Sequence, residues 1–432
     1  FIFCVAKIRT KIDIPNETFG KTQINLFFLS LIRIFAHMEQ EKKKILFILS
    51  RFLDGGIDMV LVDYLRKLAL HPEYEIGFAI CTQMDELEVF ADAIPQNVKV
   101  YHLVEDRRLT QWRKMKITRR LPLHIKLFDE VFLSPIRRHL IGKGLKELSK
   151  QYDILVDFDC CQYAYLKHIT TKKVAWYHFS FKHTMEHNPR RTKRIGQHLA
   201  YYDNVVVISK AMMEEGEELF PWLNGKWKLI YNAKDQQLLE EKASEAVNDS
   251  RIHQSYILSV ERLEESQKDT TTLLHAYKIL KEEYHISERL YLLGKGRDKE
   301  KLQQLAVQLG LQDDVVFLGF SPNPYPWIKH AKLIAHSAKM EGLPTAMIEA
   351  LILGKLIVAT DCPTGPREIL DEGKAGLLVP VGDAKAMADA IHQLLTDTQL
   401  QQDIARRMST HQENFLFPST MKRFEQLVHS LQ

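Results

Sequence analysis

The sequence predicts an α/β protein with two doubly wound domains, each a parallel sheet flanked by helices. Three observations support this class. Short apolar runs typical of buried strands alternate with longer helical patterns along most of the chain. These runs form two series, which the polar segment 238–254 separates. A chain of 432 residues also exceeds what one hydrophobic core usually fills.

The first series of strands begins with the apolar run 45–49. A turn containing Gly55 and Gly56 follows it, and then a helical pattern over 59–68. A strand, a glycine turn and a helix form the opening unit of a doubly wound domain, and the two glycines would let the backbone approach a phosphate or an acceptor closely. An ordinary turn explains them equally well. Further strands are expected at 76–80, 98–103, 154–158, 173–177 and 205–208, so this domain is expected to span 38–230.

The second series lies in 231–410, which is expected to form the C-terminal domain. The segment 238–254 is interpreted as helix or linker. A last helix is expected at about 418–431, within a terminal segment 411–432. Strands of the second series are expected at 256–260, 290–293, 315–318, 333–336 and 356–360.

The start of the chain differs from the rest. The first residue is Phe1, whereas Met38 precedes a charged stretch that runs directly into the first strand. We therefore expect Met38 to be the biological start and 1–37 to be an upstream extension, whose deletion leaves activity unchanged.

Cysteine content and hydropathy bound the cellular context. The cysteines are odd in number and form no C-x-x-C pair, so neither a disulfide framework nor a zinc site is expected, which favours a reducing compartment. No stretch of 18 uncharged apolar residues exists, so no spanning helix is expected. We expect a cytoplasmic protein. The cysteines are Cys4, Cys81, Cys160, Cys161 and Cys362.

A basic segment, 107–126, contains eight Lys or Arg residues and no acidic one, with apolar residues interleaved. Such a mixture suits an anionic membrane surface or a phosphorylated acceptor, and the patch is assigned to Arg113, Lys114, Arg119 and Arg120. A solvated helix face is the alternative. No nucleic-acid recognition module accompanies the charge, so nucleic acid is not expected as a partner.

The most informative motif is 341–349, which places Glu341 and Glu349 eight positions apart. Pro344 and Thr345 suit the first turn of a helix that Gly354 ends, so the helix start should open onto Glu341. Helix starts favour bound phosphate, and carboxylates accept from sugar hydroxyls. The combination indicates a nucleotide-sugar site, although two glutamates at this spacing are common in a chain with 55 acidic residues.

Two cations follow a strand end at Arg262 and Lys268. A diphosphate leaving group needs fixed positive charge as its own negative charge develops, and Arg adds a planar fork for phosphate oxygens. A surface coincidence is the alternative. The glycine turn at Gly294 and Gly296 also follows a strand, but Lys299 stands where a dinucleotide-binding site needs a third glycine. This argues against a dinucleotide site, and the turn either lines a nucleotide pocket or is an ordinary turn.

Together these segments resemble retaining glycosyltransferase family 4, in particular bacterial enzymes of lipopolysaccharide and surface-polysaccharide synthesis. The motif 341–349 resembles the family's Glu-x7-Glu motif, and the other segments occur in the family's order over most of 44–430. The resemblance implies the GT-B fold, with two Rossmann-like domains facing a central cleft. It also implies that the last helix crosses back to the N-terminal domain.

The resemblance further implies roles for individual residues. Glu341 would lie by the sugar ring, Glu349 would accept from ribose, and phosphates would rest on Arg262, Lys268 and the loop after 356–360. His178 matches a histidine near the transferred sugar, although one of 18 histidines is often structural. Asn232 matches a turn between the two domains of the family. The segment 319–327 matches a loop that packs near the nucleotide base. Glu261 stands where the family usually has a glycine. The remaining donor-site residues implied are Gly294, Gly296, Gly342, Leu343, Pro344, Thr345, Gly365, Pro366 and Arg367.

The function expected is transfer of a hexose or N-acetylhexosamine from a nucleotide-sugar, a UDP-sugar by family frequency, to a lipid-linked or lipopolysaccharide-type acceptor. Front-face displacement without a metal is favoured, because the one Asp-x-Asp match, Asp157 and Asp159, ends a buried strand away from the donor residues. Peripheral association with the inner face of the cytoplasmic membrane is expected. The alternatives are a soluble sugar or sugar-phosphate transferase and a catalytically inactive nucleotide-sugar-binding partner subunit.

Overall fold

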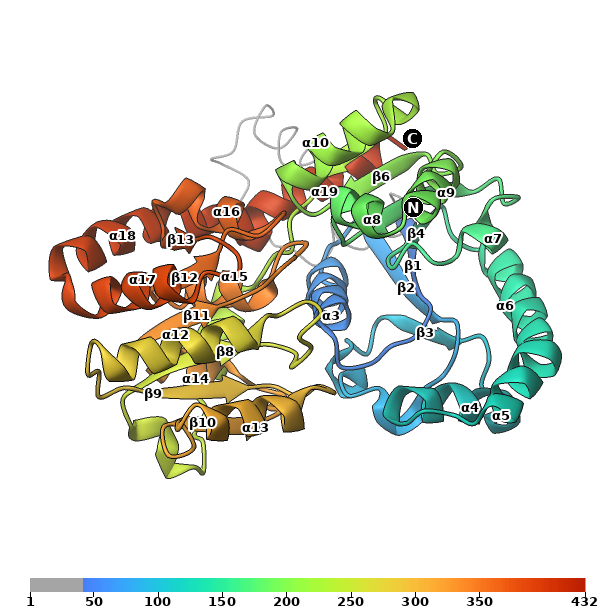
Figure 1. Cartoon of the computed structure of the whole chain (residues 1–432). Helices are drawn as coiled ribbons and strands as arrows, with labels where there is room; N and C mark the ends of the chain where they lie inside the picture. Colours follow the sequence, from blue (N-terminus) through green and yellow to red (C-terminus); the bar gives the residue numbers. More distant parts are fainter. Residues whose placement is uncertain (1–41, 432) are drawn as a thin grey trace, which may run out of the picture. The chain divides into compact units, whose positions relative to one another are not determined.

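The computed structural model describes residues 42–431, so the predicted extension 1–37 and Cys4 lie outside the described residues. Within the described range, residues 44–71 and 75 onward belong to one compact unit. This unit contains two parallel sheets, and Figure 1 colours their domains blue to green and yellow to red.

The N-terminal sheet has seven parallel strands in the order β3-β2-β1-β4-β5-β6-β7. The predicted strands are present, and the apolar side chains of all but the edge strand β3 are buried, as a covered parallel sheet requires. The last strand was not predicted. The strands are β1 (Lys43–Leu49), β2 (Tyr74–Ile80), β3 (Lys99–His102), β4 (Ile154–Asp157), β5 (Lys172–Tyr177), β6 (Asn204–Val207) and β7 (Trp227–Leu229).

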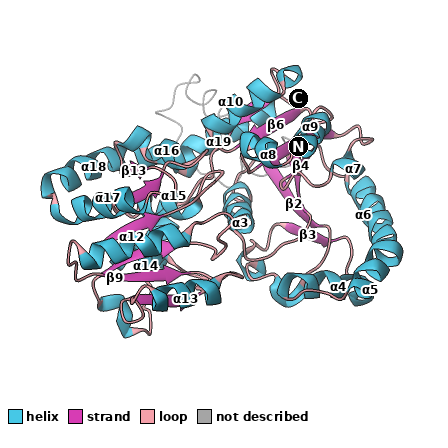
Figure 2. Ribbon diagram, in the orientation of Figure 1, coloured by secondary structure: helices cyan, strands magenta, loops and turns pink. Residues whose placement is uncertain are grey.

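Helices connect these strands, and Figure 2 shows them flanking the sheet. The first helix begins at the predicted glycine turn and buries one face against the sheet. The helices are α3 (Gly56–Leu68), α4 (Arg107–Thr118), α5 (Leu123–Phe128), α6 (Ser134–Leu148), α7 (Tyr163–Leu166), α8 (Phe181–His187), α9 (Pro189–Leu199) and α10 (Lys210–Leu219), with a π-helical turn η3 (Asp129–Leu133) before α6.

The C-terminal sheet has six parallel strands in the order β10-β9-β8-β11-β12-β13. The five predicted strands are present, and the short strand β13 was not predicted. The strands are β8 (Tyr256–Val260), β9 (Arg289–Leu293), β10 (Val315–Gly319), β11 (Leu333–His336), β12 (Ile357–Thr360) and β13 (Leu377–Val379).

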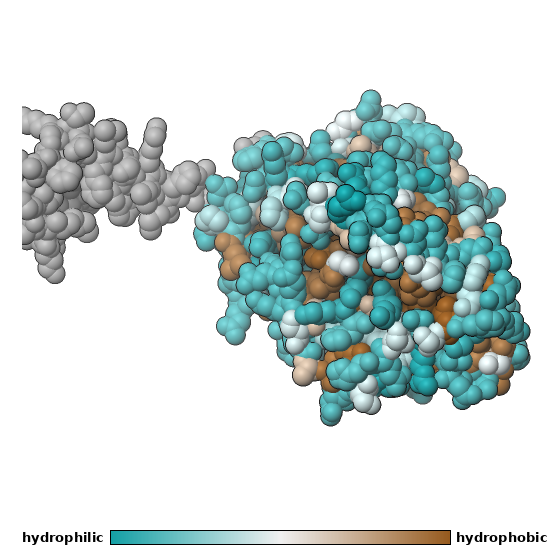
Figure 3. Space-filling view, turned by 90° about the vertical axis from the view of Figure 1, so that its left-hand side faces the viewer, coloured by the Kyte–Doolittle hydropathy of each residue, from teal (hydrophilic) through white to brown (hydrophobic). Residues whose placement is uncertain are grey.

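The helices of this domain include the one predicted after Glu341, which Gly354 ends in a left-handed conformation with φ of 69°. Figure 3 looks onto the face that carries α17 and α18, and that face is mostly hydrophilic. The helices are α11 (Gln236–Ala243), α12 (Thr270–Glu282), α13 (Lys299–Gln308), α14 (Tyr325–His330), α15 (Thr345–Ile352), α16 (Pro366–Ile369), α17 (Ala384–Thr396) and α18 (Thr398–His411).

Both sheets reverse their strand order at their first strand. The chain passes from β1 to β2 and β3 on one side and then to β4 on the other, and β8 stands likewise between β9 and β11. Ligands in open α/β sheets bind at the carboxyl ends of strands beside such a switch point. The loops after β1, β4, β8 and β11 are therefore the expected walls of a site.

The last helix, α19 (Phe417–His429), returns to the N-terminal domain, as predicted. Phe424 stacks on Phe47 of β1 with ring centroids 6.4 Å apart, and Phe417 meets Tyr64 of α3 edge to face at 5.6 Å. Arg423 donates to the carbonyl oxygen of Leu229 at 3.3 Å. The returning helix ties the C-terminal segment to the core of the first domain.

The predicted basic patch needs a correction, because its residues do not share one exposed surface. Lys114 is 9% exposed and forms an ion pair with Asp85. Arg113 is partly buried and lines a small cavity of the N-terminal domain. Only Arg119 and Arg120 are exposed. The charge pattern alone does not reveal that the helix buries Lys114 and partly buries Arg113.

The described residues contain no helix that combines the length and the apolarity needed to cross a membrane. The four described cysteines are free thiols.

Candidate active site

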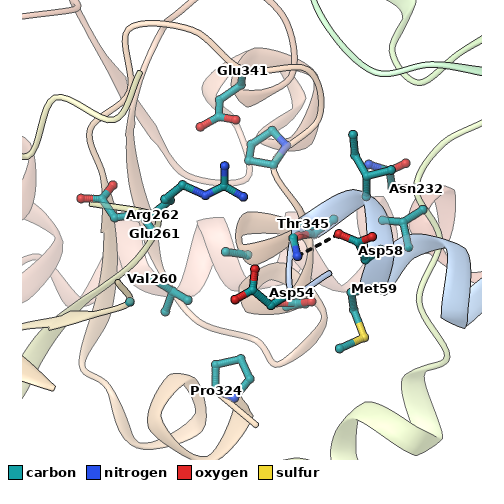
Figure 4. Close-up of a pocket in the computed structure, with 18 of the residues that line it drawn as sticks. Asp54, Asp58, Met59, Asn232, Val260, Glu261, Arg262, Pro324, Glu341 and Thr345 are labelled. Atoms are coloured by element: carbon teal, nitrogen blue, oxygen red, sulfur yellow. Dashed lines mark hydrogen bonds between the residues drawn. The ribbon is translucent and has the colours of Figure 1, made fainter. Parts of the chain in front are cut away.

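A cavity of about 460 Å³ lies between the loops at the carboxyl ends of the two sheets. It is lined by residues of both domains, and Figure 4 draws part of its wall. Most predicted site residues meet here, whereas Gly296, Gly365, Pro366 and Arg367 do not line it. Those that do are Gly55, Gly56, His178, Arg262, Lys268, Gly294, Glu341, Gly342, Leu343, Pro344, Thr345 and Glu349.

Glu341 is the centre of a buried charge network. Its Oε1 pairs with the Lys268 ammonium and accepts from Nε2 of His336 at 3.0 Å. Burial alone would raise the pKa of Glu341, but the Lys268 charge and the His336 hydrogen bond outweigh it and lower this pKa to about 2. Burial lowers the pKa of His336, so its ring is neutral and donates. Glu341 is thus a fixed negative charge at all physiological pH values.

Glu349 belongs to a second buried network that joins the two domains. Its Oε1 lies 2.7 Å from Nζ of Lys234, which also pairs with Asp63 of α3 at 2.9 Å. The Tyr325 hydroxyl lies 3.3 Å from the same Oε1. Burial lowers the pKa of Lys234, but the two carboxylates outweigh it and raise this pKa well above its ordinary value. Because Oε1 is already occupied, a ribose hydroxyl, the partner predicted for Glu349, would have to donate its hydrogen bond to Oε2.

Arg262 is a cationic residue of the cavity that forms no ion pair with any described carboxylate. Its side chain is exposed, and within the described residues it forms no ion pair. A Cβ on Gly55 would lie 3.4 Å from its Nη2, so the guanidinium passes close over the start of α3. In Figure 4 it extends into the cavity below Glu341. A free guanidinium beside a helix start suits an anionic ligand.

Sequence reasoning missed two aspartates in the part of the cavity wall that the N-terminal domain contributes. Asp58 accepts from the N–H of Leu53 at 3.0 Å and of Gly55 at 2.9 Å, which holds the turn before α3; Figure 4 labels Asp58. Burial raises the pKa of Asp58 to about 6 against these hydrogen bonds. Asp54 forms an ion pair with Lys295 across the cavity. A sequence signal was present, because a capping aspartate three residues after Gly55 is a helix-start pattern.

His178, predicted to lie near a transferred sugar, lines the cavity, and its ring is anchored. Its Nε2 lies 2.7 Å from the Phe158 carbonyl oxygen, and because a carbonyl only accepts, Nε2 carries the proton. Burial lowers the pKa of His178 to about 4. The ring is therefore neutral, and its Nδ1 is left as an acceptor.

Gly342 permits a close approach of its loop to the backbone of the N-terminal domain. A Cβ at this position would lie 2.1 Å from the backbone oxygen of His178, so no side chain fits. Gly294 and Gly296 are similarly close to the backbone of Glu261 and Leu263, at 1.8 and 2.2 Å from a built Cβ. These two glycines therefore serve loop packing, and only Gly294 also faces the cavity.

The loop after β12 supports the site from behind. A Cβ on Gly365 would lie 2.7 Å from Pro344, and Arg367 points away into ion pairs with Asp361 and Glu372. Glu368 accepts from the N–H of Lys210 at 2.8 Å, which links this loop to α10 of the other domain. The structure thus packs Gly365 against residues 342–344 and leaves 365–368 off the cavity surface.

The far wall is aromatic and proline-rich. Phe320, Pro322, Pro324 and Tyr325 line it, from the loop predicted to pack near a base. Nζ of Lys295 lies 4.3 Å from the centre of the Phe320 ring. Such a wall offers flat apolar contact to a nucleobase.

Glu261, at the position where the resemblance led us to expect glycine, is a buried carboxyl group next in sequence to Arg262. Its Oε1 accepts from the Thr270 hydroxyl at 2.7 Å, and its buried Oε2 has no partner in the described chain. Burial raises the pKa of Glu261 from 4.5 to about 8 against the Lys268 charge. Glu261 is therefore protonated and uncharged at neutral pH, so Lys268 forms its ion pair with Glu341 and not with Glu261.

We predict that Glu261→Gln flattens the pH dependence of stability. The raised pKa means that Glu261 contributes stability that is fully present below pH 4.5 and is lost as the pH rises through 8, because the unfolded chain ionises first. The loss is about 1.4 kcal/mol for each unit of pKa difference. Urea unfolding from pH 4 to 9, with exposed Glu300→Gln as control, checks this. Parallel profiles for Glu261→Gln and the unsubstituted chain would contradict it.

Metal ligands are not concentrated in this cavity. Within the described residues, one group of three possible ligands has its donor atoms within 4.8 Å of one another, namely His183, Glu186 and His187. None of the three lines the cavity, and two are exposed.

Comparison with known proteins finds a family match within the second domain. Residues 240–410 match the family described as glycosyl transferases group 1. The chain is 30% identical over 213 residues to the N-acetylgalactosamine-N,N'-diacetylbacillosaminyl-diphospho-undecaprenol 4-alpha-N-acetylgalactosaminyltransferase of Campylobacter jejuni, a match that covers 49% of this chain and 56% of that protein. It is 24% identical over 325 residues to the lipopolysaccharide 1,6-galactosyltransferase of Salmonella typhimurium, covering 70% and 79%. The chain thus spans little more than half of the Campylobacter protein's length.

Solved structures share the whole architecture. The Anabaena protein HepE, crystallised with UDP and glucose, has a TM-score of 0.70 at 19% identity, and the match covers 90% of this chain and 100% of that one. The apo lipopolysaccharide outer core galactosyltransferase WaaB has a TM-score of 0.61 at 18% identity, covering 90% and 100%. At such identities the likeness concerns the fold, and the predicted GT-B fold is confirmed.

Proposed function

We propose that this chain, whose residues 240–410 form a glycosyl transferases group 1 domain, transfers a hexose or N-acetylhexosamine from a nucleotide-sugar to a glycan acceptor with retention of configuration. One observation carries the proposal. The unpaired guanidinium of Arg262 and the fixed pair of Lys268 and Glu341 line one cavity with the starts of α3 and α15. Positive groups for a diphosphate and a fixed carboxylate for sugar hydroxyls are thereby combined.

In the proposed reaction, the bond between the sugar C1 and the leaving phosphate oxygen breaks while a bond from the acceptor oxygen to C1 forms on the same face. The acceptor proton passes to the leaving phosphate oxygen, so a nucleoside diphosphate and a glycoside result. Arg262 and Lys268 stabilise the negative charge that develops on the phosphate. Glu341 stabilises the positive charge that develops on the sugar ring.

The carboxyl groups of the cavity support this route over a covalent one. Each of the five among its described residues is held through at least one oxygen: Asp54 by Lys295, Asp58 by two backbone N–H groups, Glu261 by Thr270, Glu341 by Lys268, and Glu349 by Lys234. Glu261, whose Oε2 has no partner in the described chain, is protonated at neutral pH and is therefore a poor nucleophile. A nucleophilic carboxylate must be free to reach C1. We therefore favour front-face displacement.

We propose UDP as the nucleotide and a lipid-linked or lipopolysaccharide-type glycan as the acceptor. The aromatic wall at Phe320 and Tyr325 suits a flat base, and HepE holds UDP on the same fold. The names of the Campylobacter and Salmonella relatives specify such acceptors. We further propose that Arg262 and Lys268 replace a divalent metal, so that no metal cofactor is needed.

An apolar face beside Arg119 and Arg120 supports placing the protein at an anionic membrane, on its cytoplasmic side. Large apolar side chains of α5, η3 and α6 are exposed there in one run. Apolar side chains with flanking cations are typical of interfacial helices. The exposed side chains are Leu123, Leu127, Phe128, Val131, Phe132 and Ile136.

We predict that Phe128→Ser with Phe132→Ser weakens binding to phosphatidylglycerol vesicles at least about tenfold, because burying each phenylalanine contributes about 1.5–3 kcal/mol. Co-sedimentation with vesicles measures this. Leu70→Ser, which removes an exposed leucine elsewhere, is the control. Vesicle binding that survives the double substitution would reject this face, and a chain that never binds vesicles would favour a soluble acceptor.

The experiment that tests the proposed function is a transfer assay with purified chain, UDP-sugars and membrane glycolipid extract, with and without EDTA. We expect one UDP-sugar to be consumed with an α-linked product, at a rate that EDTA leaves unchanged. Loss of the rate in EDTA, restored by Mg²⁺ or Mn²⁺, would overturn metal independence. Inversion of the linkage would overturn retention.

A further inference from the structure

A second cavity, of about 160 Å³, lies within the N-terminal domain and shares no residue with the large one. Its wall includes Ser50, Thr82 and Gln162, which directly or closely follow strands β1, β2 and β4. It therefore occupies the ligand-binding edge of this sheet. Four arginines also line it: Arg51, Arg113, Arg137 and Arg138.

Arg137 is the residue that makes this cavity a built site. It is 2% exposed, and its Nη1 donates to the Leu109 carbonyl oxygen at 2.8 Å and to Asp129 at 2.7 Å. Its Nε and Nη2 are buried and have no partner in the described chain. These two nitrogens form one edge of the guanidinium plane, the edge that holds two oxygens of an oxyanion side by side.

Leaving such donors unsatisfied is costly. A buried hydrogen-bonding group without a partner destabilises a protein, and a charged group does so more strongly. The buried hydroxyl of Ser134, in the same wall, also has no partner among the described residues. A bound anion would satisfy Ser134 and the open edge of Arg137 together.

The charge of the cavity is positive. Asp129 pairs with Arg137, and Glu130 pairs with Arg138 at 3.0 Å. Asp159 lies behind the wall, where it accepts from the N–H of Ser50 at 2.9 Å. Asp157 also lies at this wall, since it accepts from the N–H groups of Cys161 and Gln162, but burial raises its pKa to about 8, so it is largely protonated at neutral pH. The three remaining carboxylates are fewer than the four arginines, and neither Arg51 nor Arg113 forms an ion pair with any described residue.

We propose that this arginine cavity is a subsite for a phosphate group carried by the acceptor. Its volume is several times the ≈ 30 Å³ that one water occupies, which leaves room for a phosphate. Arg51 lies on its wall and Asp54 on the wall of the large cavity, so the two Cα atoms are at most about 11 Å apart. A phosphate held here would fix a short glycan with its acceptor hydroxyl toward the donor. The inference rests on the proposed function.

The test measures inorganic pyrophosphate binding by calorimetry in the full chain carrying Arg262→Ala, which removes the one cation of the large cavity that pairs with no described carboxylate. Arg137→Lys keeps a charge beside Asp129 but removes the open edge, and Arg51→Gln changes an exposed side chain that the fold does not need. We expect each to raise the pyrophosphate Kd about tenfold or more. Arg190→Gln, an exposed arginine of α9 outside both cavities, should leave Kd unchanged.

A kinetic arm uses the chain with Arg262 intact. Arg51→Gln should raise the acceptor KM about tenfold and leave the donor KM unchanged. Pyrophosphate binding that is equal in Arg137→Lys, Arg51→Gln and the control would overturn the subsite. Binding of phosphatidylglycerol vesicles that depends on Arg51 while pyrophosphate does not bind would assign the cavity to a lipid headgroup instead. Failure of UDP to bind, with pyrophosphate still held, would reject the donor site and leave this subsite standing.

Discussion

Glu341→Gln should lower kcat/KM for sugar transfer by about 10²–10³-fold, the loss typical when one fixed electrostatic group is removed from a reacting centre. The pKa of Glu341, lowered to about 2, keeps the side chain negative throughout the working pH range. The amide is nearly isosteric but neutral, so it cannot stabilise positive charge on the sugar. It also leaves Lys268 without its counter-charge.

The control for this variant is Glu300→Gln, a substitution of an exposed glutamate in α13. Steady-state rates should be unchanged in the control. Nucleotide binding should persist in Glu341→Gln, because Arg262 and Lys268 remain. A Glu341→Gln enzyme with full activity, or a chain whose substitution leaves the cellular glycan unaltered, would favour an inactive nucleotide-sugar-binding partner instead.

Lys234→Met should lower the free energy of unfolding by about 3–5 kcal/mol, the cost of breaking a buried ion network by removing one partner. Lys234 is 3% exposed and neutralises Asp63 of the first domain and Glu349 of the second. Its loss leaves two buried carboxylates with no cation between them. Because these carboxylates belong to different domains, the substitution should also weaken the contact between the domains.

Urea unfolding at pH 7 measures this effect. Lys193→Met, which removes an exposed lysine of α9, should change the free energy by less than about 0.5 kcal/mol. Combining Lys234→Met with Glu349→Gln should recover part of the loss, because one uncompensated charge is then absent. A loss under 1 kcal/mol for Lys234→Met would mean that water reaches the network and screens it.

Much of the fold could be predicted from the sequence, because local pattern determines it. Apolar runs such as 45–49 and 333–336 are strands, and the helix between Pro344 and Gly354 forms as its terminal residues predicted. The strands β7 and β13 escaped prediction, since each has three residues and shows no periodicity. The last helix was placed by resemblance, and its aromatic contacts with Phe47 and Tyr64 confirm that placement.

The candidate site was predictable where one loop carries the chemistry, and not where distant segments meet. Glu341 and Lys268 were singled out, but that His336 completes their network depends on a neighbouring strand. Lys234 lies 115 positions before Glu349 in the sequence, and their ion pair is visible only in the folded structure. Arg113 of α4 belonged to a predicted surface patch, yet the structure places it in the wall of a cavity that Arg137 and Arg138 of α6 also line. Long-range contacts of this kind leave no periodic trace in one sequence.

Thermal unfolding with UDP, GDP, ADP, CMP and their sugars, with and without EDTA, tests directly whether the large cavity holds a nucleotide-sugar through Arg262. A ligand at 100 times its Kd adds about 2.7 kcal/mol of stability, enough to move the melting curve. We predict that UDP and its sugars stabilise the chain, that EDTA does not remove the effect, and that Arg262→Ala does. No shift with any nucleotide, or a shift that Arg262→Ala leaves intact, would contradict the account.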